Sequence, residues 1–283
     1  MDALASLSDV KAWVSPSQGI GIGSTASNAN DDVLFTRLIQ QASQFILNYT
    51  NRNTFFKLNF TEVRNGDGSR GITLANGPVT SVVSVTVDNQ TIPKADLPPL
   101  AQRGWSLEPW TGSPPGGLQQ LVLSSGYSFN KGLRNVLVNY NYGFYVADEA
   151  GTIPAAADYK ITAQQTKGPF GRDDGVKFSS NGAALTLVTG TPATGQYNVD
   201  TAGNYTFAVA DAGKGVLISY SYIPSDINQA CIEIVGERYR YMQRIGQQSH
   251  SAAGQVTVSF SLKSMQDYVR QILDNYRFVA IVW

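Results

Sequence analysis

Histidine and cysteine are almost missing from this chain, which has one residue of each in 283: His250 and Cys231. A lone cysteine excludes an internal disulfide framework, and this pair leaves almost no room for a zinc site built from such ligands. A Ser-His-Asp or Cys-His arrangement would need His250, which lies in a Ser/Gln/Gly stretch with no acidic neighbour in sequence. We therefore expect no enzyme, no cofactor and no metal, and we expect Cys231 to be a small buried hydrophobe.

An excess of charge and a long apolar run are also missing. The 21 basic residues balance the 21 acidic ones, so no global field draws the protein to nucleic acid or to a membrane. No stretch approaches the roughly 18 unbroken apolar residues of a membrane-spanning helix. The first residues lack a basic region followed by an apolar one, which argues against a secretory signal. We expect a protein that is made and kept in a cytoplasm, with no membrane partner.

Apolar residues at three- and four-residue spacing predict four helices. Ser6 and Asp9 are placed to cap the first, and Pro224 suits the first turn of the third. The predicted helices cover residues 7–14, about 31–51, 224–245 and 265–276. Each has a single apolar stripe, so each packs on one side and leaves a polar face.

From residue 55 to residue 144 the apolar period changes to two, which predicts an antiparallel sheet. The pair Asp88-Asn89 and the run Asn65–Ser69 have the composition of turns between strands. The Gly- and Pro-rich stretch 105–117 is predicted to be a loop.

Two similar strand endings, Val136–Gly143 and Val216–Ile223, indicate how the chain is organised. Only the second runs into a helix, which suggests one parent fold that was cut before that helix to receive an insert. Between them, strands recur at intervals of about ten residues, the cadence of a small immunoglobulin-like sandwich. Within this segment we expect Asp173 and Asp174 to lie in a turn rather than to form a carboxylate pair or a metal site.

The predicted fold class is α+β: a small helical bundle and an antiparallel β-sheet, with an inserted immunoglobulin-like β-sandwich. Four segments follow from this, namely a helical part (1–55), an antiparallel β region (56–147), the inserted β module (148–222) and a C-terminal helical part (223–283). The last segment ends in the most apolar stretch of the chain, which has to pack on its own fold or on a partner.

Three arginines lie near the end of the third predicted helix: Arg238, Arg240 and Arg244. Their interleaving with tyrosines is compatible with contact to DNA, although three arginines are a weak electrostatic signal. Favourable charge at a helix C-terminus and contact with a neighbouring subunit are the alternatives. The sequence leaves all three open.

With the insert removed, an ordered series of motifs resembles the head-to-tail connector (adaptor) proteins of tailed bacteriophages. The series comprises Leu7–Val14, Asp31–Ile46, Tyr49–Phe55, Asn65–Ser69, Leu74, Gly77–Val85, Val138–Gly143, Pro224–Arg240, Arg244–Gly246, Val256–Phe260 and Met265–Arg277. The insert and the apolar C-terminal stretch depart from the family pattern. Each motif alone is degenerate, and their order and number carry the resemblance.

The resemblance implies a structural virion protein, assembled in the host bacterial cytoplasm, at the head–tail interface. Such proteins form a ring on the portal protein, usually of twelve subunits, extend the channel for the passing double-stranded DNA, and present a surface to a neck or tail-completion protein. Carried over to this chain, the resemblance makes the final helix and C-terminal stretch the candidates for docking to the portal. The residues implied are Tyr276, Arg277, Phe278, Ile281 and Trp283.

A capsid-decorating or host-glycan-binding protein that acts through the inserted module is the alternative function. It would be favoured if aromatic residues of the module, such as Tyr197, Tyr205 and Phe207, were clustered on an exposed face. Their placement in strands makes a position in the core the stronger expectation.

Overall fold

The computed structural model describes residues 2–14, 29–95, 103–109, 117–124, 126–156, 158–243, 249–252, 256–259 and 267–278. The chain forms two compact units. One combines Met1–Thr50 with Ser225–Asn275, and the other combines Asn51–Pro224 with Tyr276–Trp283. The protein is α+β, with helices toward both ends of the chain and mostly antiparallel strands between them, as the sequence predicts. The division into four segments stays a prediction.

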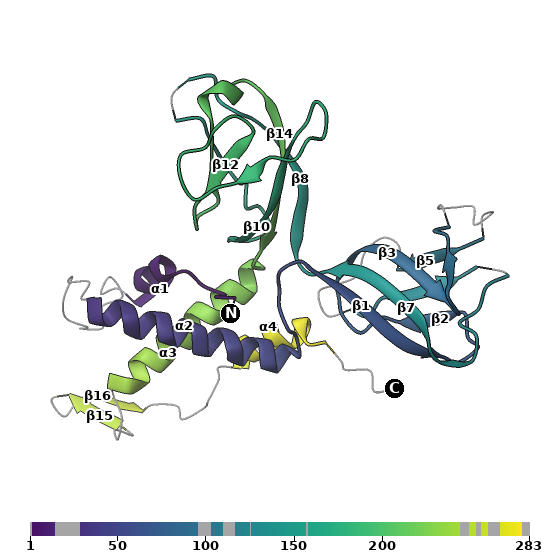
Figure 1. Ribbon diagram of the computed structural model, residues 1–283. Helices are drawn as coiled ribbons and strands as arrows, with labels where there is room; N and C mark the ends of the chain where they lie inside the picture. The colour runs from purple at the N-terminus through teal and green to yellow at the C-terminus, as the bar shows by residue number, and fades with distance from the viewer. Residues whose placement is uncertain are drawn as a thin grey trace. The chain divides into compact units, whose positions relative to one another are not determined.

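The first unit contains the helices α1 (Leu7–Val14), α2 (Ala29–Thr50), α3 (Ser225–Gln243) and α4 (Asp267–Tyr276), the last of which ends at the first residue assigned to the second unit. A hairpin of β15 (Ser249–Ala252) and β16 (Val256–Ser259) lies between α3 and α4 in the chain. The two long helices α2 and α3 pack against each other (Figure 1). The predicted cap of α1 is confirmed, because the Asp9 amide donates to Ser6 Oγ at 3.1 Å.

Buried hydrogen bonds fix the start of the chain between α2 and α3. The amide of Leu4 donates to Ser43 Oγ at 3.0 Å, and Asn228 Nδ2 donates to the Leu4 carbonyl at 2.9 Å. Leu4, Ser43 and Cys231 are 0% exposed, which confirms that Cys231 is buried. Because the amide and the carbonyl of Leu4 both have buried partners, the short N-terminal segment is part of the helical core.

In the second unit, two antiparallel sheets share one core (Figure 1). The first has the order β1 (Leu58–Gly66), β7 (Gly132–Tyr142), β3 (Val79–Val87), β4 (Gln90–Ile92), and the second has the order β2 (Gly71–Thr73), β6 (Gln120–Leu123), β5 (Trp105–Glu108). Asp88 and Asn89, with φ of 50° and 61°, form the predicted turn between β3 and β4. The prediction of a loop from residue 105 is wrong for β5, since Trp105 and Leu107 pack into the core despite their Gly- and Pro-rich surroundings.

Residues 145–222 build two further sheets of the second unit. One has the order β10 (Phe170–Phe178), β14 (Gly215–Tyr222), β8 (Tyr145–Thr152), and the other has the order β11 (Thr186–Leu187), β12 (Gln196–Val199), β13 (Asn204–Phe207), β9 (Lys160–Thr162). A single 3-10 turn, η2 (Val209–Asp211), precedes β14. Buried residues of both sheets form one core. An immunoglobulin-like topology for this segment stays a prediction.

The two ends of this segment are joined by strand pairing. Strands β8 and β14 are antiparallel, and their register places Tyr145 opposite Ser221 and Gly215 opposite Thr152. The Tyr222 amide also donates to the Phe144 carbonyl at 3.1 Å. Strand β8 begins at Tyr145, three residues before the predicted start of the insert, and no strand is predicted there from the sequence.

Asp173 and Asp174 lie inside β10, so the prediction of a turn is wrong. Asp173 accepts hydrogen bonds from the hydroxyls of Tyr197 and Tyr205, at 2.6 and 3.0 Å. The turn-like composition reflects a bulge in the pairing of β10 with β14 between Asp173 and Gly175, where Gly175 has a φ of 114°. The carboxylate is needed here because buried tyrosine hydroxyls require a hydrogen-bond partner.

Candidate functional site: the C-terminal segment and its anchor

Arg52 stands at the centre of the contacts that hold the C-terminal segment. It follows Asn51, whose φ of 55° ends α2 in the left-handed conformation. Its guanidinium carbon lies 5.7 Å from the ring centre of Phe55, 5.6 Å from that of Phe144 and 5.6 Å from that of Phe278. We call Arg52, Phe55, Phe144, Tyr276 and Phe278 the Arg52 cluster.

Hydrogen bonds to the backbone complete the Arg52 cluster. Arg52 Nε donates to the Tyr276 carbonyl at 2.8 Å, and a terminal nitrogen of the same guanidinium donates to the Gly77 carbonyl. Beside it, Asn51 Nδ2 donates to the Phe278 carbonyl at 3.1 Å. Burial lowers the pKa of Arg52 to about 10, which still leaves the guanidinium protonated at neutral pH. The cluster is thus a cation enclosed by aromatic rings and carbonyl oxygens.

The aromatic residues of the cluster also contact one another. The Tyr276 ring lies 6.1 Å from Phe55 and 5.8 Å from Phe144, measured between ring centres. Tyr276 is 6% exposed and Phe278 is 5% exposed. Both side chains are therefore engaged within the chain and do not offer the exposed aromatic anchors that the docking prediction pictures. Arg277, between them, is exposed.

The other predicted docking residues, Ile281 and Trp283, lie outside the described residues. Docking to a portal stays a prediction for the C-terminal segment as a whole. What the structure adds is a fixed starting point for that segment, at Phe278, which the sequence analysis missed. Arg52 is visible in the sequence only as part of the motif Tyr49–Phe55. No sequence pattern links it to its partner Tyr276, which lies more than 200 positions later.

Of the three arginines on the third predicted helix, two are described. Arg238 is exposed and Arg240 is half-buried on α3, and Arg244 lies outside the described residues. Between them, Tyr239 packs on Phe35 of α2 at 4.8 Å between ring centres, so it belongs to the helix contact. Contact of these arginines with DNA or with a neighbouring subunit stays a prediction.

The aromatic residues named for glycan binding are buried. Tyr197, Tyr205 and Phe207 are 2%, 0% and 3% exposed and belong to the core shared by the two sheets of residues 145–222. Their predicted position in the core is confirmed. Stacking of a sugar on these three rings would require the core to open.

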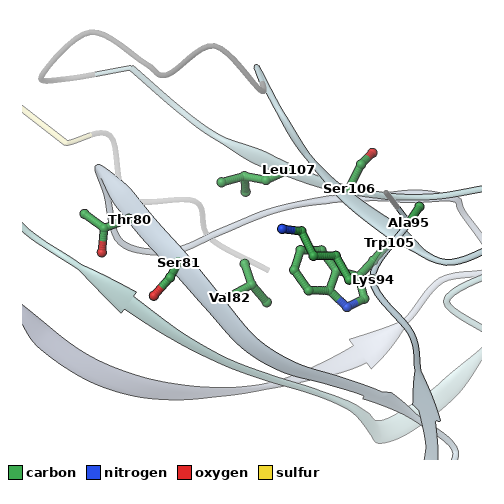
Figure 2. Close-up of a pocket in the computed structure, with 8 residues that line it drawn as sticks. All are labelled: Thr80, Ser81, Val82, Lys94, Ala95, Trp105, Ser106 and Leu107. Atoms are coloured by element: carbon green, nitrogen blue, oxygen red, sulfur yellow. The ribbon is translucent and has the colours of Figure 1, made fainter. Parts of the chain in front are cut away.

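A pocket that no sequence pattern predicts lies between β3 and β5 (Figure 2). It has a volume of about 220 Å³. Eight residues line it: Thr80, Ser81, Val82, Lys94, Ala95, Trp105, Ser106 and Leu107. Lys94 Nζ lies 6.0 Å from the centre of the Trp105 ring, and Val82 forms part of the opposite wall (Figure 2).

None of the helices in the described part of the chain is both long and apolar enough to cross a membrane. Within the same residues, no group of three or more His, Cys, Asp or Glu side chains is placed to hold a metal ion.

Comparison with known proteins adds little to this geometry. No protein-family model and no curated protein matches the chain. Among solved structures, one described as "Neck of empty GTA particle computed with C6 symmetry" contains a chain that is 12% identical, with a TM-score of 0.37. The alignment covers 98% of this chain and 90% of that chain. A likeness at this TM-score carries no argument about the fold or the function of the present protein.

Proposed function

We propose that this chain is a structural, non-enzymatic protein of a phage-like particle, a connector between head and tail. In this role it forms a ring on the portal vertex, extends the DNA channel and gives neck or tail proteins a surface to attach to. The proposal starts from the ordered motifs that resemble the connector family. Twelve subunits are the expected number because that is usual for the family.

The observation that carries the proposal is the meeting of motifs from opposite ends of the chain. Leu7–Val14 and Asp31–Ile46 share one compact unit with Ser225–Arg240, although the β-strands separate them in sequence. The buried contacts of Leu4 with Ser43 and Asn228 join these two ends. An arrangement in which the terminal motifs form one body supports the idea of a parent fold that received an insert.

The strand pairing of β8 with β14 supports the same idea. Since Tyr145 lies opposite Ser221, the chain enters and leaves residues 145–222 at neighbouring points. A segment with adjacent ends can be added to a fold without displacing the parts on either side. This geometry favours a connector that carries an additional module over a protein built around that module.

The Arg52 cluster supports a role for the end of the chain in docking. A segment that starts from a fixed point loses less conformational freedom on binding than one that starts from a loose end. The clean test removes residues 279–283 and retains Phe278, because Phe278 belongs to the buried cluster. We expect this truncated subunit to stay folded and to lose attachment to the portal protein. Unchanged attachment would contradict docking through these residues.

The connector role itself is tested by disrupting the gene in the genome of the particle that encodes it, followed by negative-stain electron microscopy. Heads filled with DNA or leaking it, beside detached tails, are the expected result. Complete tailed particles would overturn the proposal. Mass photometry of the purified protein with the portal protein measures the number of subunits in the ring.

A further inference from the structure

Strand β3 is paired along only part of its second edge, the edge opposite to β7. Strand β4 pairs with it at Val85, Thr86 and Val87 alone. Pro93 follows the end of β4 and has no backbone N–H to donate. Beyond it the chain bonds to β5 instead: the Trp105 amide donates to the Pro93 carbonyl, and the Ala95 amide donates to the Trp105 carbonyl, both at 2.9 Å. Within the described residues, Thr80–Ser84 has no strand partner on this side.

A side chain closes the other end of this gap. The Val79 amide donates to Gln119 Oε1 at 2.5 Å, and Gln119 Nε2 donates back to the Val79 carbonyl at 3.4 Å. The buried amide of Gln119 thus makes the two hydrogen bonds that a neighbouring strand would make. The open edge of β3 therefore has defined limits, with Gln119 at one end and β4 at the other.

The pocket of Figure 2 lies along this open edge. Thr80, Ser81 and Val82 of β3 form one wall, and Lys94, Trp105 and Leu107 form the other. Trp105 and Val82 supply apolar surface, and both belong to the packing of the β core. A pocket beside an unpaired strand edge is the arrangement in which proteins bind an extended peptide, since the edge provides main-chain hydrogen bonds and the pocket receives a side chain.

Lys94 is the one charged residue among the eight that line the pocket. Its ammonium lies over the Trp105 ring, and no carboxylate of the described residues is within ion-pair distance of it. A lysine stacked on an indole and lacking a carboxylate partner favours an anionic ligand. The charge of the pocket thus selects an acidic segment over a basic one.

We propose that an extended, acidic segment of a partner protein binds here as an added strand on Thr80–Ser84. One of its apolar side chains packs against Trp105 and Leu107, and one of its carboxylates pairs with Lys94. This inference does not depend on the connector role. An alternative explanation is that this edge is protected from pairing, because proteins use bulges and lysines for that purpose. Strand β3 has bulges between Val79 and Ser81 and between Val82 and Ser84. Protection alone predicts that no peptide binds.

The test measures binding of a labelled peptide to the full chain by fluorescence anisotropy. The probe has about six residues, alternates valine and glutamate, and has blocked ends. Lys94→Glu should weaken its binding about tenfold or more, and the same variant should gain affinity for a peptide in which lysine replaces glutamate. Lys131→Glu, at an exposed lysine directly before β7, is the matched control and should leave binding unchanged.

A second probe tests the added strand without altering the protein. Methylation of alternate backbone nitrogens in the acidic peptide removes its main-chain donors and should abolish binding. Amide resonances that shift on binding should map to residues 80–84 and to Trp105. The proposal is overturned if the acidic peptide does not bind, if Lys94→Glu and Lys131→Glu have equal effects, or if the methylated peptide binds as well as the parent.

Discussion

The Nε of Arg52 donates a 2.8 Å hydrogen bond to the backbone carbonyl of Tyr276, which lies 224 positions later in the chain. The chain passes between its two units after Thr50 and again after Asn275, so this bond joins two of its three crossing points. Because the guanidinium also contacts three aromatic rings, one side chain holds the start of the C-terminal segment in place.

Replacement of Arg52 by methionine should destabilise the Arg52 cluster. Arg52→Met keeps an apolar stem among the rings but leaves the carbonyls of Gly77 and Tyr276 without their donor, and we expect a loss of about 2–4 kcal/mol in unfolding free energy. Urea denaturation measures this loss. Trypsin cleavage after the exposed Arg277 should also become faster. Arg238→Met, at an exposed arginine of α3, is the control, and equal effects of the two variants would contradict the anchoring role.

Cys231 should report when the helical unit opens. Burial raises the pKa of its thiol to about 12 from an ordinary 9.0, so in the folded protein the reactive thiolate is about a thousandfold scarcer than for an exposed cysteine. We expect labelling by a thiol reagent to be slow under native conditions and complete in denaturant. Gln41→Cys in a Cys231→Ala background places a thiol on the exposed face of α2 and should react at once. Fast labelling of native Cys231 would show that the helices part readily.

Alkaline pH should unfold the second unit through its buried tyrosines. Burial is the largest cause that raises the pKa of Tyr140, Tyr197 and Tyr205 above the ordinary 10.0. The neighbouring carboxylate raises it further, which is Glu62 for Tyr140 and Asp173 for the other two. The folded state keeps these phenols neutral while the unfolded chain ionises. The stabilisation is therefore complete below pH 10 and decreases above it, by about 1.4 kcal/mol per pH unit for each tyrosine.

The measurement for this pH dependence is the midpoint of urea unfolding between neutral pH and pH values above 10.0. Tyr197→Phe should reduce the slope of the loss, whereas Tyr268→Phe, at a residue that is 42% exposed, should leave it unchanged. Phenolate absorbance that rises without any loss of structure would contradict the prediction.

Gly143 should tolerate no side chain. Its φ is 118°, and a Cβ placed there would lie 2.4 Å from the Phe56 carbonyl oxygen. Gly143→Ala should therefore cost at least about 1–3 kcal/mol of stability. Gly190→Ala is the control, since a Cβ there meets nothing within 4 Å, and it should change stability by less than about 0.5 kcal/mol. Similar thermal midpoints for the two variants would show that the turn between β7 and β8 can relax.

Local patterns in the sequence are enough to predict the helices, because each has apolar residues at three- and four-residue spacing. The detail of their faces was harder to predict. Val33 fits the apolar spacing of α2 but is 71% exposed, while Ser43 and Thr50 are buried because each has a hydrogen-bond partner. Apolar spacing cannot identify a buried polar residue such as Ser43, whose partner Leu4 lies 39 positions earlier in the sequence.

The strands that the sequence analysis missed share one cause. Strand β5 is four residues long and β8 carries Asp148 and Glu149, so neither shows clear alternation. Their pairing with β6 and β14 decides their conformation. The Arg52 cluster and the pocket beside β3 were unpredictable for a similar reason, since both are made by segments that meet only in the folded chain.

The pairing of β8 with β14 has a mechanical consequence. If tension is applied along the chain between β7 and α3, it reaches Tyr145 and Ser221 first, and their strands would separate from that end one hydrogen bond at a time. Because β14 also pairs with β10 and carries Val216, Ile218 and Tyr220 of the core of residues 145–222, that core comes under load as the pairing opens. The resistance of this segment to stretching therefore depends on the residue pairs nearest its two ends, Tyr145 with Ser221 and Val146 with Tyr220.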